Sequence, residues 1–147
     1  MKVIGAILII LALVAAVVPQ FTDCESQGKA LTLANGKTVA MKCHWTSEAS
    51  TAVAVPLLLM GGLVIFSKCK ETLRALSILG LAFGAFLILL PTALIGVCAN
   101  PEMICNSVMK PTLILTGLLT AIISGAILVR AWKGEATGGA GPSSQPA

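Results

Sequence analysis

Four long apolar runs alternate with short polar stretches along the chain. They cover about residues 3–21, 49–66, 75–97 and 111–132. Each run is near the roughly 20 residues that an α-helix needs to cross a hydrocarbon core of about 30 Å. Strands are disfavoured because an open sheet would leave unpaired backbone groups in lipid. The pattern therefore predicts an all-α four-helix transmembrane bundle.

The composition narrows the classes of function. The chain is 56% apolar with a mean hydropathy of +0.96, above the roughly 45–50% apolar share of soluble domains. No charged residue or histidine lies well within a run, and Glu48 sits only at the edge of the second. Proton relays and ion pathways usually need such groups, and the sequence has no nucleotide-binding loop, nucleophile–base pair or carboxylate dyad. We expect neither an enzyme nor a self-sufficient transporter, and a net charge of +4 is too small for a nucleic-acid surface.

The two ends of the chain carry signals of their own. A basic start at Lys2 and small residues at Ala15 and Ala16 leave open that the first run is a cleaved secretory signal. The run is as long as the upper limit for a signal core, so a retained span is favoured. Residues 134–147 are rich in Gly, Ser, Pro and Ala and predict a disordered cytoplasmic tail after a membrane domain over residues 1–133.

The basic residues indicate how the bundle is oriented. The link over residues 67–74 holds three basic residues against one acid, and three more flank the chain ends: Lys2, Arg130 and Lys133. Basic residues of the other two connections are balanced by acids. The positive-inside bias therefore predicts cytoplasmic termini, and outer loops over about residues 22–48 and 98–110 on the extracytoplasmic side of the plasma membrane.

Small residues at four-residue spacing predict where two helices approach closely. Gly80 and Gly84 form one such pair, and Gly117, Ala121 and Gly125 continue the spacing in the fourth run. Small residues let helix backbones come together and gain dispersion contacts in lipid. We interpret them as a seam within the bundle, with an interface between copies of the chain as the alternative.

The two halves of the chain share a weak repeat. The first half gives a span with Pro19, then Cys24, then Met41-Lys42-Cys43-His44. The second half gives a span with Pro91, then Cys98, then Met103-Ile104-Cys105-Asn106. Both halves run in the same direction, which predicts two pseudo-repeated helical hairpins related by an axis normal to the membrane.

Four of the five cysteines fall on the predicted outer side. Exported thiols tend to form disulfides, and four cysteines allow three pairings. The repeat favours Cys24–Cys43 and Cys98–Cys105, each of which would stabilise the fold by about 2–4 kcal/mol through restriction of the unfolded chain. Cys69 lies on the predicted cytoplasmic side, where thiols stay reduced.

A metal site is an alternative use of the same residues. Met41, Cys43, His44, Met103 and Cys105 combine thioether, thiol and imidazole groups, the ligands that suit Cu(I). The spacing matches neither a paired CxxC zinc site nor a haem attachment signal. Thiol–disulfide exchange is a further alternative, although the closely spaced CxxC pair of redox enzymes is absent.

These motifs resemble those of an uncharacterised prokaryotic family of four-span membrane proteins. The resemblance rests on the Met-Lys-Cys-His-aromatic stretch over residues 41–45 and on the Pro…Ile-Gly-Val-Cys…Met-x-Cys pattern over residues 91–105. It covers nearly the whole chain before the tail. In the family the second motif often continues with histidine where this chain has Asn106, which weakens a symmetric two-histidine site.

The resemblance implies a four-span topology and a prokaryotic membrane, with transporter-like neighbours. We therefore expect a non-enzymatic structural or accessory subunit of a membrane complex, with the lipid bilayer and a membrane protein such as a transporter as partners. No cofactor is expected under this hypothesis, and copper is expected under the metal-binding alternative.

Overall fold

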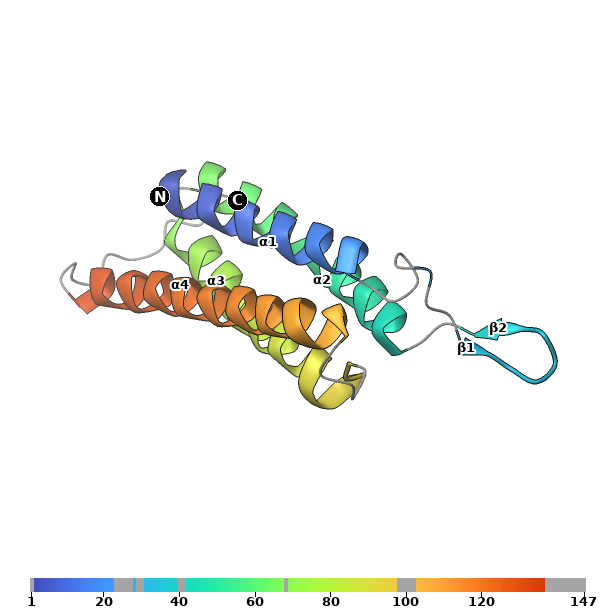
Figure 1. Ribbon diagram of the computed structural model, residues 1–147. Helices are drawn as coiled ribbons and strands as arrows, with labels where there is room; N and C mark the ends of the chain where they lie inside the picture. Colours follow the sequence, from blue (N-terminus) through green and yellow to red (C-terminus); the bar gives the residue numbers. More distant parts are fainter. Residues whose placement is uncertain are drawn as a thin grey trace, which may run out of the picture.

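The computed structural model describes residues 2–22, 28, 31–39, 42–67, 69–97 and 103–136 (Figure 1). Four long helices account for most of these residues: α1 (Lys2–Thr22), α2 (Lys42–Phe66), α3 (Lys70–Leu89) and α4 (Lys110–Ala136). Short π-helices, η1 (Leu90–Leu94) and η2 (Cys105–Met109), continue α3 and precede α4. Two strands, β1 (Leu31–Thr32) and β2 (Thr38–Val39), pair antiparallel between α1 and α2.

All four helices, with their π-helical extensions, are long and apolar enough to span a membrane. Large apolar side chains are exposed along each helix, such as Ile10, Leu59, Ile78 and Ile122, and apolar surface of this kind faces lipid in a bundle. The all-α four-helix bundle is thus confirmed, and the protein is a multi-pass membrane protein. Its interior is built on fully buried leucines from every helix: Leu8, Leu57, Leu87, Leu90 and Leu113.

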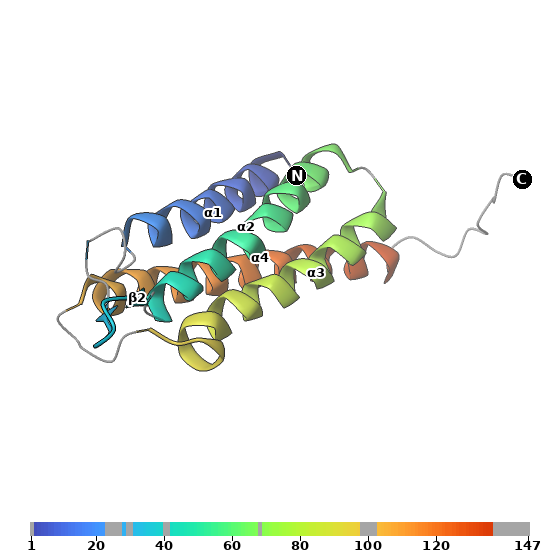
Figure 2. The ribbon, with the colours of Figure 1, turned by 90° about the vertical axis from the view of Figure 1, so that its right-hand side faces the viewer.

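The bundle consists of two helical hairpins. Helix α1 packs chiefly against α2, and α3 against α4, with fewer contacts between the pairs (Figures 1 and 2). In the second hairpin a Cβ atom added at Gly84 would lie 2.8 Å from the Gly117 carbonyl oxygen and 2.9 Å from the Ala121 nitrogen. The predicted small-residue seam is therefore an intramolecular contact between α3 and α4.

The first hairpin has a corresponding close approach that the sequence did not indicate. A Cβ atom added at Gly61 would lie 2.9 Å from Ile9 Cγ1 and 3.2 Å from the Ile9 nitrogen. Gly5, on the facing side of α1, has the Gly61 carbonyl oxygen 2.9 Å from its own Cβ position. Each hairpin is thus held by glycines at its helix–helix contact.

Helix boundaries differ from the predicted spans at the starts of α2 and η2 and at the end of α4. Helix α2 begins at Lys42 rather than near residue 49, and helical structure before α4 begins within the predicted outer loop, at η2. Helix α4 continues to Ala136, beyond the predicted start of the tail at residue 134, and residues 137–147 lie outside the described part. The extra turns are polar, and α2 buries its polar side chains there against the rest of the bundle.

The third span ends earlier than the apolar run. The N–H groups of Ile95 and Gly96 both donate to the Leu90 carbonyl oxygen, at 3.2 and 3.1 Å, and Gly96 has a positive φ of 79°. This left-handed residue closes the helix end, a conformation that glycine adopts without steric penalty. The chain therefore leaves the helix at Gly96, although the apolar run extends to Val97.

A small β-hairpin projects from one end of the bundle (Figure 1). Leu31 pairs with Val39 and Thr32 with Thr38, and the turn between them contains Gly36 at a φ of +73°. The sequence pattern predicted only a loop here.

Candidate functional site

The described residues of both cysteine motifs lie at the end of the bundle that carries the β-hairpin, which we call the outer end. Cys43 and His44 lie in the first turn of α2, and Cys105 is the first residue of η2. In Figure 1 the start of α2 and the start of η2 both lie at this end. Cys24, Met41 and Cys98 fall outside the described residues.

Cys43 and Cys105 are both buried and occupy equivalent positions in the two hairpins. Cys43 has no exposed surface, Cys105 is 2% exposed, and both belong to the continuous apolar core of the bundle. Each stands at the start of the second membrane helix of its hairpin. The weak repeat in the sequence thus has a structural counterpart.

Thioether and imidazole groups adjoin this part of the core. Met103 is half-buried and packs against the core cluster that contains both cysteines. His44 is half-buried, and its ring lies 5.9 Å from that of Trp45 in an edge-on arrangement. The Trp45 side chain is exposed, as expected for an indole at a membrane interface.

Met109 has a thioether group and was not among the metal ligands predicted from the sequence. It is fully buried in the same core cluster and follows Cys105 by four residues at the end of η2. Residues four apart on a helix share a face, and this spacing is the signal that was available in the sequence.

Hydroxyl groups fix the start of α2 against its neighbours. The buried Thr46 hydroxyl donates to the Gly96 carbonyl oxygen at 2.8 Å, which joins the first hairpin to the end of η1 in the second. The Gln20 side-chain amide donates to the Thr51 hydroxyl at 3.0 Å, which joins α1 to α2. The bond of Thr46 gives the polar start of α2 a partner within the bundle, so the helix can extend beyond its apolar part.

Two further serines line the buried face of α2 next to Cys43. The Ser50 hydroxyl donates to the Ser47 carbonyl oxygen at 2.8 Å. The Ser47 hydroxyl, on a side chain only 1% exposed, has no hydrogen-bond partner among the described residues.

The buried side chains at the outer end include thiols, a thioether and hydroxyl groups, and one imidazole is half-buried beside them. Within the described ranges, no three His, Cys, Asp or Glu side chains lie close enough to hold a metal ion together. Methionine sulfur is not counted among these groups. No two cysteines stand at disulfide distance in the described part of the chain. Each predicted disulfide has one partner, Cys24 or Cys98, outside that part, so the predicted pairings stay predictions.

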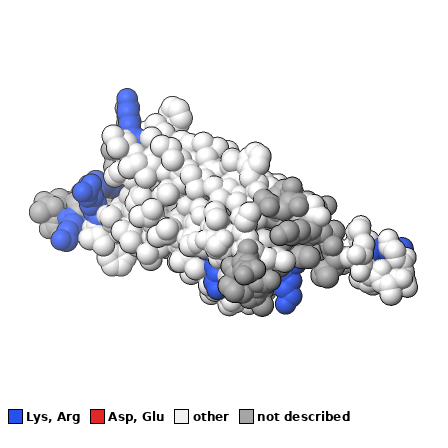
Figure 3. Space-filling view, in the orientation of Figure 1, with Lys and Arg blue, Asp and Glu red and all other residues white. Residues whose placement is uncertain are grey.

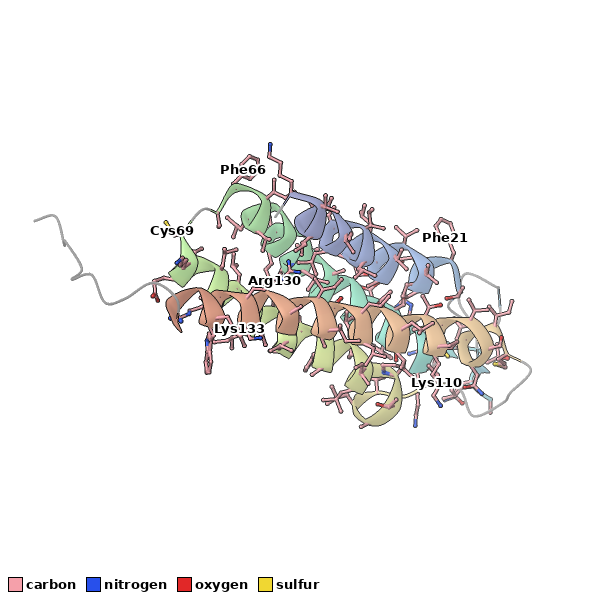
Figure 4. The ribbon with its side chains drawn as sticks, turned by 90° about the vertical axis from the view of Figure 1, so that its left-hand side faces the viewer. Phe21, Phe66, Cys69, Lys110, Arg130 and Lys133 are labelled. Carbon is pink, nitrogen blue, oxygen red and sulfur yellow. The ribbon has the colours of Figure 1, made fainter. Side chains whose placement is uncertain are left out.

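The opposite end differs in charge and exposure. Cys69 is exposed there beside the start of α3, and Arg74 forms an ion pair with Glu71 at 3.7 Å. Figure 4 shows Cys69, Phe66 and Lys133 at this end, and Phe21 and Lys110 at the outer end.

A family model described as "Domain of unknown function (DUF4418)" matches residues 2–130. The chain belongs to this family. The DUF4418 match covers all of α1 to α3, both cysteine motifs and most of α4. Comparison with the curated proteins and with the solved structures gave no match. The DUF4418 assignment carries no activity, so the function is argued from the outer end itself.

Proposed function

We propose that this DUF4418 protein is a non-enzymatic accessory subunit of a plasma-membrane complex, with its outer end stapled by disulfides and in contact with a membrane-protein partner such as a transporter. One observation carries the proposal, namely the equivalent burial of Cys43 and Cys105 at the starts of the two returning helices. A cysteine held rigidly in each hairpin is a fixed anchor to which the preceding loop can be tied.

The anchors suit a structural role. A disulfide from Cys24 to Cys43 would tie the loop with the β-hairpin to the first turn of α2, and one from Cys98 to Cys105 would tie the shorter loop to η2. An isolated two-stranded hairpin is only marginally stable in water, so a covalent tie near its base would hold it in place. Leu33 and Val39 of this hairpin are exposed and offer apolar contacts to a partner.

The charge distribution supports an extracytoplasmic outer end. Five basic side chains are described at the opposite end, where the sequence has two acids, Glu71 and Glu135: Lys2, Lys70, Arg74, Arg130 and Lys133. Figure 3 shows Lys and Arg side chains at both ends of the bundle, but in the sequence the four lysines of the outer connections are matched by four acids, Asp23, Glu25, Glu48 and Glu102. An excess of Lys and Arg is typical of the cytoplasmic side of a membrane protein, and this supports our proposal that the outer end faces the oxidising side, where disulfides persist.

Peptide mapping of the purified protein without reductant tests this proposal. We expect linked peptides that join Cys24 to Cys43 and Cys98 to Cys105, and an unmodified thiol at Cys69. Free thiols at all four outer cysteines in protein from the membrane would contradict it.

The partner is tested by cross-linking in the native membrane. A photoreactive residue at Val39 in the hairpin should give a discrete cross-linked product with a second membrane protein. The same residue at exposed Leu59, in the middle of α2, serves as the control and should not. Equal products from both positions would argue against a hairpin contact.

Soft-metal binding is the second candidate, and Met109 is the observation that favours it. With both disulfides formed, the thioethers of Met103 and Met109 and the imidazole of His44 are the candidate ligands among the described residues of the outer end. Thioether and imidazole groups bind Cu(I). Cu(I) titration should therefore show weaker binding in His44→Ala and Met109→Leu. Met60→Leu, at a buried methionine in the middle of α2, is the matched control, and equal affinity in all three variants would remove this candidate.

A further inference from the structure

The exposed face of α2 carries a carboxylate one turn inside its interfacial tryptophan. Exposed side chains recur along this helix at steps of three and four residues, a spacing that puts them on one face, and they include Trp45, Glu48, Val55, Leu59 and Leu63. Inward of Trp45, Glu48 is the only ionisable side chain of α2. We propose that Glu48 binds the primary ammonium group of phosphatidylethanolamine in the leaflet at the outer end of the bundle.

Glu48 lies at the level of the lipid headgroups. Trp45 is 61% exposed, and indole rings favour the interface between hydrocarbon and headgroups. Glu48 follows three residues later, about 4.5 Å further into the bilayer at 1.5 Å per residue. Side chains tilt toward the N-terminus of their helix, and α2 begins at the outer end (Figure 1). The carboxylate therefore reaches back toward the headgroups.

No cation in the described part of the chain neutralises this carboxylate. Glu48 makes no ion pair or hydrogen bond there. Lys42 precedes it by six residues, which places the two side chains about 120° apart around the helix axis. Lys37 lies in the β-hairpin and Lys110 at the start of α4, and Lys29 falls outside the described residues. An ionised group at the edge of the hydrocarbon is costly unless it is paired, so a cation from the bilayer stabilises Glu48.

The chemistry of the pair selects a primary ammonium group. A carboxylate only accepts hydrogen bonds, and an ammonium group has N–H donors to give it. Hydrogen bonds between two ionised groups are shorter and stronger than neutral ones. The trimethylammonium group of phosphatidylcholine has no N–H donor, although it can lie over an indole ring as well as a primary ammonium group can. Glu48 therefore distinguishes the two headgroups, and Trp45 does not.

The rest of the face suits a lipid rather than a protein chain. Inward of Glu48 the large exposed side chains are apolar, namely Val55, Leu59, Leu63 and Phe66. Acyl chains match such a surface, which has no second charge or hydrogen-bonding side chain to position a protein helix. The headgroup at Glu48 and the acyl chains below it thus belong to one lipid molecule.

Trp45 can report on the lipid beside Glu48. The chain has two tryptophans, and Trp132→Phe leaves Trp45 alone. This variant is placed in bilayers of equal parts phosphatidylethanolamine and phosphatidylcholine, with bromine on the acyl chains of one lipid or of the other. The lipid composition is then the same in every sample, and bromine quenches an indole that the labelled lipid contacts. The ratio of the two quenching efficiencies measures the local preference for phosphatidylethanolamine.

We expect a preference of about threefold, the middle of the range for an exposed ion pair. Glu48→Gln in the same background should abolish it. Glu71→Gln is the matched control, because Glu71 is an exposed acid at the opposite end of the bundle, and it should retain the preference. Equal quenching by both lipids before substitution, or a preference that survives Glu48→Gln, would overturn the proposal. Circular dichroism of each variant verifies the helical fold.

Carbodiimide coupling distinguishes a lipid ammonium group from a lysine side chain. The reagent condenses a carboxylate with a primary amine in contact with it, with loss of water. In the same bilayers, mass spectrometry should find phosphatidylethanolamine on the peptide that contains Glu48, in higher yield than on the peptide that contains Glu71. A link from Glu48 to a lysine of this chain or of a second copy, or equal lipid yields at both acids, would contradict the proposal.

Discussion

At Gly84 the helices of the second hairpin pack so closely that even one added carbon atom has no room. Alanine there adds a Cβ atom 2.8 Å from the Gly117 carbonyl oxygen and 2.9 Å from the Ala121 nitrogen. Both neighbours are backbone atoms, which cannot rotate away as a side chain can. Gly84→Ala should therefore force α3 and α4 apart.

The size of the effect follows from the geometry. The 2.8 Å approach is 0.6 Å shorter than the 3.4 Å at which ordinary contact begins. A gap of this order removes about a quarter to a half of the dispersion energy of each atom pair across the seam, and overpacking of this kind costs about 1–3 kcal/mol. The better helix propensity of alanine offsets about 1 kcal/mol of the loss.

Gly62→Ala is the matched control. Gly62 lies within α2, and a Cβ atom added there meets nothing within 4 Å. The gain in helix propensity is the same in both variants and cancels from their difference. The free energy of unfolding of Gly84→Ala should thus lie about 1–3 kcal/mol below that of Gly62→Ala.

Reversible unfolding in mixed micelles measures this difference. The purified variants are titrated with sodium dodecyl sulfate in a mild detergent and followed by tryptophan emission and circular dichroism. If Gly84→Ala were as stable as Gly62→Ala, the close approach of α3 and α4 would be refuted.

Two further predictions concern the outer end. Thr46→Val removes the hydrogen bond to the Gly96 carbonyl oxygen and should lower the free energy of unfolding by about 1 kcal/mol. The control is Thr112→Val, at a hydroxyl that bonds only within its own helical segment, and it should have a smaller effect in the same titration. A larger effect of Thr112→Val would contradict the link between the two hairpins. Gly36→Ala places a side chain on a residue with a φ of +73° and should destabilise the β-hairpin by about 1–2 kcal/mol. We expect faster amide hydrogen exchange in the β-hairpin and unchanged exchange in α2. Unchanged exchange in the hairpin would contradict the turn described.

The four spans and one helix seam could be predicted because their signals are local in sequence. Apolar length alone identifies a spanning helix, and the spacing of Gly80 and Gly84 marks a face that can approach a neighbour. The contact of Gly5 with Gly61 could not be found in this way. These glycines lie on different helices, and their register depends on how the two helices pack.

The start of α2 was missed for a different reason. Hydropathy assigned Thr46 and Ser47 to a loop, yet both are buried at the start of this helix. The partners that make their burial tolerable, such as the Gly96 carbonyl oxygen, come from another part of the chain. The β-hairpin did have a local signal, since Asn35-Gly36 is a frequent turn pair.

The repeat of the two cysteine motifs was visible in the sequence, but its meaning required the fold. Spacing alone did not reveal that Cys43 and Cys105 are both closed within one core, or that Met109 lies with them. The burial of each cysteine is set by the packing of its helix against the other hairpin.

The proposed function requires that the two cysteine-bearing connections face away from the cytoplasm. Labelling of intact cells with a membrane-impermeant thiol reagent tests this orientation most directly. The first sample is the native protein, in which Cys69 is exposed. The second is Leu33→Cys in a Cys69→Ser background, with the new thiol at an exposed position of the β-hairpin. We predict labelling of Leu33→Cys in intact cells and of Cys69 only after the membrane is opened. Labelling of Cys69 from outside, with Leu33→Cys protected, would contradict the account.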